Sequence, residues 1–170
     1  SLLENGIIVR NLVKVYEGDC CIDSMQALHS LSFRARRNAI TVLLGHNGAG
    51  KTTTISILTG LYPPTAGDAY VNGFSIHTHM DQVRESLGIC PQQNVLWENL
   101  SVWEHLLFAA RIKGLSWAEA ERQAREFLAD INLLDKKDNL AGELSGGMKR
   151  KLSICLAFIG GSRVVILDEP

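Results

Sequence analysis

A glycine-rich segment with one lysine is the part of the sequence best suited to chemistry. Residues 45–52 read Gly-His-Asn-Gly-Ala-Gly-Lys-Thr and match the pattern G-x-x-x-x-G-K-[ST]. Glycines let the backbone curve around a phosphate group so that N–H groups point inward, and a following helix adds its dipole. In this pattern Lys51 reaches the β- and γ-phosphates, and the Thr52 hydroxyl binds Mg²⁺. The segment predicts a nucleoside triphosphate site, most simply for ATP; the alternative is a glycine-rich turn that caps a helix.

Two acidic residues follow an apolar run near the other end of the sequence. Residues 164–167 read Val-Val-Ile-Leu, and Asp168 and Glu169 come next. Ligands in open parallel sheets bind beyond the carboxyl ends of the strands, so these acids are expected to face a bound nucleotide. We expect Asp168 to hold Mg²⁺, through water, and Glu169 to orient and polarise the attacking water. Taken alone, the pair could equally be solvated acids at a strand end.

A second pair of glycines precedes a predicted helix. Residues 144–148 read Leu-Ser-Gly-Gly-Met. Ser145 is suited to cap the helix, and Gly146 and Gly147 leave the backbone N–H groups at the helix start accessible to an anion. The segment predicts a second anion site, with an ordinary Ser-Gly-Gly cap as the alternative.

Hydrophobic periodicity predicts the elements that must position these residues. Strands with one solvated face are expected at Ile7–Tyr16 and Leu28–Phe33, as an antiparallel pair. Ala39–Leu44, directly before the glycine-rich loop, reads as a strand buried on both faces, and Lys51–Thr59 after the loop reads as a helix ended by Gly60. Further elements are expected at 67–71 (strand), 80–87 (helix), 88–90 (extended), 146–158 (helix) and 164–167 (strand).

The segment from Val95 to Asn139 interrupts the strand pattern. Ser101 and Ser116 each stand three residues before a glutamate, which is the pattern of a capping box at a helix start. We therefore expect a mostly helical subdomain inserted in an α/β core.

Charge and hydropathy narrow the class of protein. The 170 residues contain 17 Lys and Arg and 18 Asp and Glu, and the longest basic run is the three residues 149–151. This balance gives no electrostatic footprint for nucleic acid, so no nucleic-acid partner is expected. The longest apolar runs, such as Ile154–Ile159, are far shorter than the roughly 20 residues of a membrane-spanning helix.

The cysteines and histidines do not form a metal-binding pattern. Cys20 and Cys21 are adjacent, Cys90 and Cys155 are isolated, and C-x-x-C spacing is missing. We expect free thiols in a reducing compartment and solvated or packed imidazoles.

In their order and spacing, the phosphate loop, the Leu-Ser-Gly-Gly-Met segment and the Asp-Glu strand end resemble the nucleotide-binding domain of ATP-binding cassette (ABC) proteins. The resemblance extends from Asn11 to Pro170. The loop and strand end are then the family's Walker A and Walker B motifs, and Leu-Ser-Gly-Gly is its signature motif. The segments GHNGAGKTTT, CPQQNVL, VWEHL and GGMKRKLS are most similar to the A subfamily, whose members mostly move lipids. Gln93 and Lys149 depart from that subfamily, which commonly has His and Gln there.

The resemblance implies an α/β fold: a P-loop NTPase core with a mainly parallel sheet, an N-terminal antiparallel β subdomain and an inserted helical subdomain. We expect one partial ABC ATPase domain over residues 1–170. Within it, residues 1–92 form the β subdomain and P-loop core, 93–145 the helical subdomain with the signature motif, and 146–170 the signature helix and Walker B strand.

The resemblance also implies roles for single residues. Tyr16 matches the aromatic residue that stacks on adenine, or it is an ordinary strand aromatic. Gln92 matches the glutamine that contacts Mg²⁺ and the attacking water, although Gln93 lies beside it and a surface amide is the alternative. The residues expected to bind nucleotide are Tyr16, Gly45, His46, Asn47, Gly48, Ala49, Gly50, Lys51, Thr52, Thr53, Ser145, Gly146 and Gly147. The expected catalytic residues are Lys51, Gln92 and Glu169, and the expected ligands of Mg²⁺ are Thr52, Gln92 and Asp168.

In the family, Ser145 and Gly147 contact the γ-phosphate of ATP held by a second nucleotide-binding domain, in the same chain or another. The resemblance therefore implies Mg-dependent ATP hydrolysis that powers a membrane transporter, on the cytoplasmic face of a membrane, with transmembrane domains as partners. Trp97 and Trp103 lie where the family receives coupling helices, with core packing as the alternative.

Two other functions fit the same motifs. The first is a soluble ABC ATPase that acts on ribosomes or DNA, and the second is a regulatory cassette that binds ATP without hydrolysing it. The family's aspartate loop and switch histidine follow the Asp-Glu strand end, so we expect the isolated segment to be nearly inactive. The remaining strands of the family's core are missing from it too, so we expect an unpaired sheet edge and poor solubility.

Overall fold

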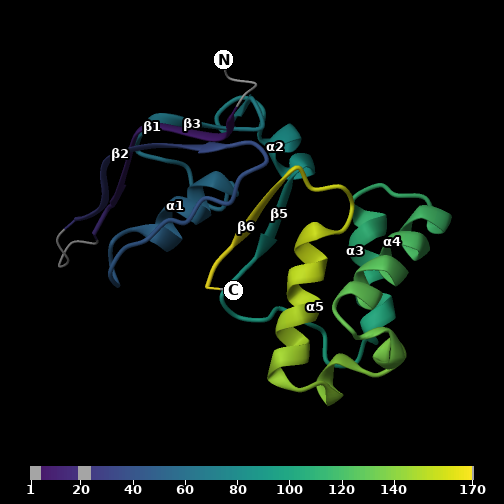
Figure 1. Cartoon of the computed structure of the whole chain (residues 1–170). Coiled ribbons are helices and arrows are strands. Elements are labelled where there is room, and N and C mark those ends of the chain that lie inside the picture. The colour runs from purple at the N-terminus through teal and green to yellow at the C-terminus, as the bar shows by residue number, and fades with distance from the viewer. Residues whose placement is uncertain (1–4, 19–23, 170) are drawn as a thin grey trace. The chain divides into compact units, whose positions relative to one another are not determined.

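The computed structural model describes residues 5–18 and 24–169, which fall into two compact units divided between Leu87 and Gly88 (Figure 1). The first unit contains β1 (Asn5–Tyr16), β2 (Met25–Arg36), α1 (Lys51–Leu58), β3 (Ala66–Val71), β4 (Phe74–Ser75) and α2 (Met80–Ser86). From the boundary onward come β5 (Leu87–Cys90), α3 (Val102–Ile112), α4 (Trp117–Asp130), the 3₁₀ turns η2 (Leu134–Lys136) and η3 (Ala141–Glu143), α5 (Gly146–Phe158) and β6 (Val164–Leu167). Cys20, Cys21 and Pro170 lie outside the described residues.

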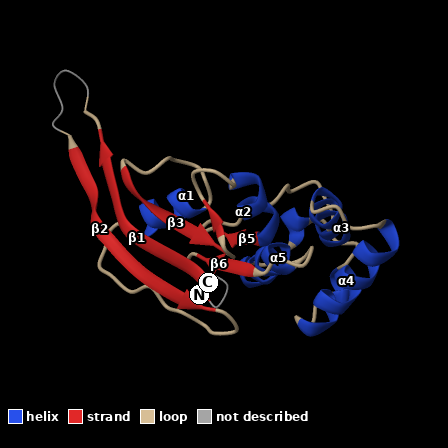
Figure 2. Cartoon of the chain, turned by 90° about the horizontal axis from the view of Figure 1, so that it is seen from above, coloured by secondary structure: helices blue, strands red, loops and turns tan. Residues whose placement is uncertain are grey.

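The first unit is built on an antiparallel sheet with strand order β2-β1-β3-β4 (Figure 2). Val9 pairs with Phe33 of β2 on one side and with Ala69 of β3 on the other. Val9 and Leu12 are almost fully buried, as is Ile57 of α1. The predicted antiparallel pair is therefore confirmed, and β1, which pairs with a strand on each side, buries the consecutive residues Ile7, Ile8 and Val9.

The prediction of a buried strand at Ala39–Leu44 is wrong for this structure. These residues have no regular secondary structure, and Ile40, Val42 and Leu44 are 97%, 69% and 86% exposed. An apolar run becomes a strand only when a neighbouring strand accepts and donates its hydrogen bonds. The strands of the first unit pair among themselves, and within the described residues none pairs with 39–44. The sequence therefore predicted the apolar character of residues 39–44 correctly and their pairing with a neighbouring strand incorrectly.

Three helices of the second unit share one hydrophobic core. Leu106 of α3, Leu128 of α4 and Leu152 of α5 are all fully buried in it. Truncating a leucine in such a core costs about 2–5 kcal/mol. The predicted helical segment is thus confirmed for α3 and α4, and α5 packs with them.

The two predicted helix starts are confirmed at Ser101 and Ser116. Ser101 forms a complete capping box, in which its hydroxyl accepts from the Glu104 N–H and the Glu104 carboxylate accepts from the Ser101 N–H. Ser116 accepts from the Glu119 N–H, but the Glu119 carboxylate binds Arg122 and Gln123 instead. Only the first of the two is therefore a reciprocal box.

The strands β5 and β6 form a two-stranded sheet and point the same way in Figure 1. The Asp168 N–H continues the pairing by donating to the Cys90 carbonyl, 2.9 Å away. Gly88 allows α5 to approach β5 closely, since a Cβ there would lie 1.8 Å from the Ala157 carbonyl oxygen. The predicted α/β fold class, with an antiparallel N-terminal sheet, a parallel pair and an inserted helical segment, is confirmed.

Two further sequence expectations concern cysteines and membrane spans. Cys90 and Cys155 are free thiols, both buried, and burial raises the pKa of the Cys155 thiol to about 11. No helix among the described residues combines the length and the apolar character needed to cross a bilayer.

Candidate nucleotide-binding site

The glycine-rich loop has the backbone that its sequence predicts. Gly48 and Gly50 have φ angles of +83° and +86°, in the left-handed region that favours glycine. A Cβ at Gly50 would lie 2.5 Å from Leu28 Cδ2 and 2.7 Å from the Ala27 carbonyl oxygen. Gly50 therefore does two things: it turns the chain into α1, and it lets the loop rest against β2.

Helix α1 starts at Lys51, directly after the loop. Its N-cap, Gly50, has no side chain to accept the first N–H groups, and no acidic residue lies in the first turn. The N–H groups at a helix start lack intrahelical acceptors and attract an anion. The alternative reading, in which the loop merely caps a helix, is weakened because the loop leaves these donors uncapped.

Lys51 folds back over the loop. Its Nζ donates to the carbonyl oxygens of Gly45 (2.7 Å) and His46 (3.1 Å), and the Ala49 N–H also donates to His46 O (3.1 Å). The ammonium group is thus held against the carbonyl oxygens of its own loop. Asn47 and Thr52 are exposed, and Thr53 is half-buried.

Tyr16 lies in the first unit at the end of β1, opposite Met25 of β2. Its ring is half-buried, makes an edge contact with the Tyr62 ring (centroids 6.3 Å apart) and lies 5.2 Å from Lys14 Nζ. Aromatic and cationic neighbours of this kind suit a tyrosine ring that stacks on a base. They suit equally an aromatic residue that only packs on its strand. Adenine stacking by Tyr16 stays a prediction.

In the second unit the structure brings Gln92 and Glu169 together. Gln92 Nε2 donates to Glu169 Oε2 at 2.6 Å, although the residues are 77 positions apart. Both side chains are exposed, and Asp168, half-buried, precedes Glu169 at the end of β6. Glu169 has a φ of +48°, a conformation that side-chain-bearing residues rarely adopt and that clusters at functional sites.

Sequence reasoning missed Arg150, which touches both segments of this pair. Its guanidinium donates to backbone carbonyls beside Gln92 and beside Glu169. The sequence showed Arg150 only as part of a short basic run. A usable signal was its spacing: on a helix, Arg150 lies one turn beyond Gly146 and therefore on the same face.

Ser145 is the N-cap of α5, and its hydroxyl accepts from the Met148 N–H at 3.3 Å. Gly146 and Gly147 are exposed, and a Cβ built on either would meet no atom within 4 Å. Neither glycine has the positive φ that would require it. Nothing within this unit explains two glycines where alanine would strengthen the helix by up to about 1 kcal/mol, so approach by an external group is the better reading.

The expected Mg²⁺ ligands lie in different units: Thr52 in the first, Gln92 and Asp168 in the second. Hydroxyl, amide and carboxylate oxygens are the donors that Mg²⁺ uses when substrate phosphates complete its shell. No group of three or more His, Cys, Asp or Glu side chains in the described parts of the chain could hold a metal by itself. The donor atoms of each unit are therefore of the kinds that Mg²⁺ binds beside a nucleotide.

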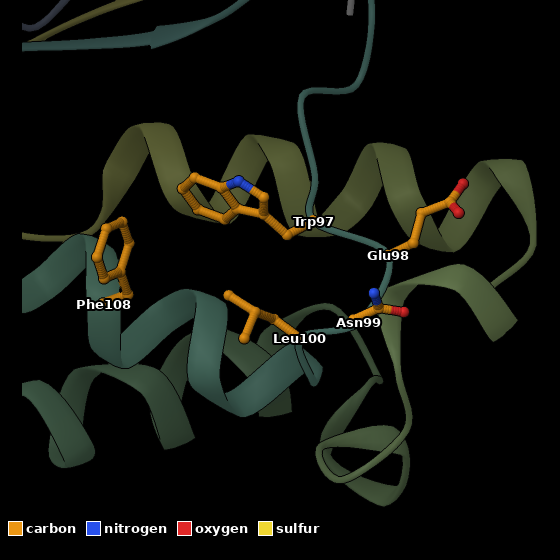
Figure 3. Close-up of a pocket in the computed structure, with 5 residues that line it drawn as sticks. All are labelled: Trp97, Glu98, Asn99, Leu100 and Phe108. Atoms are coloured by element: carbon orange, nitrogen blue, oxygen red, sulfur yellow. The ribbon is translucent and has the colours of Figure 1, made fainter.

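A shallow groove in the helical part of the second unit is lined by Trp97, Glu98, Asn99, Leu100 and Phe108. Figure 3 shows the side chains of Trp97, Leu100 and Phe108 around one space, with Glu98 and Asn99 directed away. Trp97 is 54% exposed, stacks on the buried His105 ring and meets Phe108 edge-on. Trp97 is thus a surface residue, whereas Trp103 packs against the helical core.

His105 fixes the position of Trp97. Its Nε2 accepts from the Trp97 backbone N–H at 3.0 Å, and its Nδ1 bonds the Ser101 carbonyl at 2.8 Å. A carbonyl accepts only, so Nδ1 is the donor and Nε2 the acceptor in this arrangement.

Comparison with known proteins places this geometry in a family. The family profile described as ABC transporter matches residues 28–170. The mouse retinal-specific phospholipid-transporting ATPase ABCA4 is 52% identical over 165 residues, covering 97% of this chain and 7% of that protein. Human ATP-binding cassette sub-family A member 2 is 50% identical (96% and 7%), and mouse phospholipid-transporting ATPase ABCA3 is 50% identical (97% and 10%). The chain thus spans a tenth or less of these relatives.

Solved structures agree. The structure of an ATP binding subunit of an ABC transporter matches with a TM-score of 0.83 and 32% identity, over 95% of this chain and 65% of that one. CbiO1 from Clostridium perfringens, part of the ABC transporter complex CbiONQ, matches with a TM-score of 0.84 and 27% identity, over 98% and 66%. The three relatives above, each about half identical to this chain, are members of the A subfamily. The chain belongs to the ABC transporter family as an ATP-binding domain.

Proposed function

We propose that this domain hydrolyses ATP with Mg²⁺ to power a membrane transporter, and that the transported substrate is a phospholipid. The observation that carries the hydrolytic part is the 2.6 Å hydrogen bond between Gln92 and Glu169, beside Asp168 at the carboxyl end of β6. The phospholipid part is supported by the names of relatives about half identical to this chain, which are phospholipid-transporting ATPases.

Residues of the first unit bind the nucleotide. The backbone N–H groups of the loop and of the first turn of α1 hold the phosphates, and Lys51 neutralises their charge. Because Lys51 Nζ already lies on the loop carbonyls of Gly45 and His46, it needs only a short movement to meet a phosphate oxygen. Tyr16 stacks on the base.

Residues of the second unit act on the attacking water. Glu169 accepts a hydrogen bond from that water and so directs its oxygen at the γ-phosphorus, and Gln92 holds the Glu169 carboxylate in place. Thr52, Gln92 and, through water, Asp168 would hold Mg²⁺, which would supply charge neutralisation at the phosphates when bound. Catalysis is then mostly positioning and electrostatics.

The start of α5 is proposed to complete the site of a second nucleotide-binding domain. Ser145, Gly146 and Gly147 offer exposed N–H groups and an open backbone, which suit close approach of a phosphate. Two such domains close head to tail around two ATP molecules and reopen after hydrolysis. The partner domain lies in the same polypeptide or in another.

The groove at Trp97 and Phe108 is the proposed contact with the transmembrane domains. Exposed aromatic side chains with a polar rim are typical of protein interfaces. The domain would then work at the cytoplasmic face of the membrane.

The test uses the complete protein in phospholipid vesicles, with ATP hydrolysis and lipid movement measured together. We expect Glu169→Gln to bind MgATP normally but to lose at least about 100-fold in hydrolysis, together with lipid movement. The matched control is Glu121→Gln, an exposed position on α4. Hydrolysis by Glu169→Gln at the wild-type rate would contradict the proposal.

The same preparation tests the two other functions. A soluble ABC ATPase of ribosomes or DNA predicts hydrolysis that rises when nucleic acid, not lipid, is added. A regulatory cassette predicts MgATP binding without product in a single-turnover experiment.

A further inference from the structure

We propose that Arg150 is a positioning residue that sets the geometry of Gln92 and Glu169. This inference rests on the proposed roles of those two residues in ATP hydrolysis. It concerns the second unit alone, where all the contacts lie.

The contacts of Arg150 divide between two segments of the chain. Nη1 donates to the carbonyl oxygens of Pro91 (2.5 Å) and Gln92 (3.3 Å). Nη2 donates to the carbonyl oxygens of Asp168 (2.8 Å) and Glu169 (2.9 Å). One planar guanidinium thus joins the backbone that carries Gln92 to the backbone that carries Glu169.

Strand pairing ends at these two points. Gln92 follows the end of β5, and within the described residues the ladder continues beyond β6 through the bond from the Asp168 N–H to the Cys90 carbonyl. Glu169 also adopts a positive φ, which residues with a side chain rarely adopt and which persists only when the surroundings impose it. The two bonds from Nη2 to the Asp168 and Glu169 carbonyls hold the backbone on both sides of this angle.

The geometry calls for arginine specifically. A guanidinium presents donors in a rigid fork and can bond both segments at once, whereas a lysine ammonium is a compact point charge without that fork. The side chain is half-buried, so the bonds are partly shielded from water.

The position of Arg150 on α5 gives its four hydrogen bonds a second consequence. Ser145, proposed to contact the ATP of a partner domain, is the N-cap of the same helix. Arg150 therefore also connects α5, the helix that Ser145 caps, to the backbone that carries Gln92 and Glu169.

The experiment measures ATP hydrolysis by the complete protein in phospholipid vesicles, for Arg150→Gln and Arg150→Lys. The matched control is Lys151→Gln on the same helix, which removes a cation that donates to the Ile131 carbonyl at 3.1 Å, away from the pair. We expect both Arg150 variants to lose about 10- to 100-fold in kcat, because misplacing a catalytic group by about 1 Å costs that much. KM and MgATP affinity should change less than about twofold, and Lys151→Gln should match the wild type.

A double-variant cycle separates positioning from a general structural role. If Arg150 acts through Gln92 and Glu169, the double variant Arg150→Gln/Gln92→Ala should lose much less kcat than the product of the two single fold-losses. Multiplying effects would overturn the inference. So would loss of the folded protein in both Arg150 variants while Lys151→Gln folds, because Arg150 would then serve the fold alone.

The controls also separate this inference from the proposed function. A wild-type rate of ATP hydrolysis in Glu169→Gln would contradict the proposed function itself. Loss of hydrolysis in Glu169→Gln with wild-type kcat in both Arg150 variants would overturn the role of Arg150 and leave the proposed function standing.

Discussion

The glycine-rich loop of the first unit and the Gln92–Glu169 pair of the second unit are held by different means. The loop takes its shape from backbone geometry, with positive φ at Gly48 and Gly50 and a lysine that bonds carbonyls of its own loop. Gln92 and Glu169, far apart in sequence, are joined by side chains, directly and through Arg150. An element built from consecutive residues is local, whereas a pair built from distant residues depends on the fold of its unit.

The largest expected effect separates binding from catalysis. Lys51→Ala removes the cation proposed to meet the phosphates, so MgATP affinity of the complete protein should fall at least about 100-fold, and hydrolysis with it. Glu169→Gln should lower hydrolysis and keep affinity. Titration with a fluorescent ATP analogue measures the affinity, with Lys136→Ala, an exposed lysine, as the control.

Equal affinities in Lys51→Ala and the wild type would break the comparison, because nucleotide binding would not then depend on the loop lysine.

Two glycine substitutions sharpen the comparison through stability. Gly50→Ala forces a positive φ on alanine and drives its Cβ into Leu28 and Ala27, so the free energy of unfolding should fall by about 2–4 kcal/mol. Gly147→Ala meets open space on a helix, so stability should stay equal or rise by up to about 1 kcal/mol, while hydrolysis falls.

Urea unfolding and ATP hydrolysis measure the two outcomes. Gly147→Ala with undiminished hydrolysis would argue against contact of this helix start with a partner's ATP.

The exposed apolar segment before the loop predicts association of the isolated 170-residue chain. Ile40 and Leu44 are 97% and 86% exposed, and unpaired apolar backbone of this kind favours intermolecular pairing. Replacing both with lysine should lower light scattering of the isolated chain several-fold at equal concentration. The matched control replaces Arg34 and Arg36, exposed on β2, with lysine, and it should scatter like the parent chain.

A parent chain that stays monomeric without these substitutions would contradict this prediction, because the apolar segment would then be covered in solution.

The smallest effect is a pH dependence at the surface of α4. Hydrogen bonds from Arg122 and Gln123 lower the pKa of the Glu119 carboxyl from 4.5 to about 2. Because the folded pKa is below the unfolded value, the stabilisation is fully present above about pH 4.5 and is lost as the pH falls toward 2. The difference in unfolding temperature between the wild type and Glu119→Gln should therefore shrink over that range.

Glu121→Gln, two residues further on and exposed, serves as the comparison. A wild-type advantage over Glu119→Gln that is constant from pH 6 to pH 3 would contradict the ion-pair account.

Much of the fold could be predicted because its signals are local. The capping box at Ser101, the helix at 146–158 and the antiparallel pair each depend on residues within a few positions or on simple alternation. The strand predicted at Ala39–Leu44 failed for the opposite reason, since apolar character is local but a strand needs a partner.

The sequence by itself determined the phosphate loop, because glycine spacing and one lysine specify a backbone shape wherever a strand-like segment and a helix adjoin it. It also determined which helix ends present open N–H groups. Only the tertiary structure decided that Gln92 bonds Glu169, that Glu169 takes a positive φ and that Arg150 spans the two segments. Those contacts join residues 18 to 77 positions apart, and folding of the whole second unit is the physical cause that brings them together.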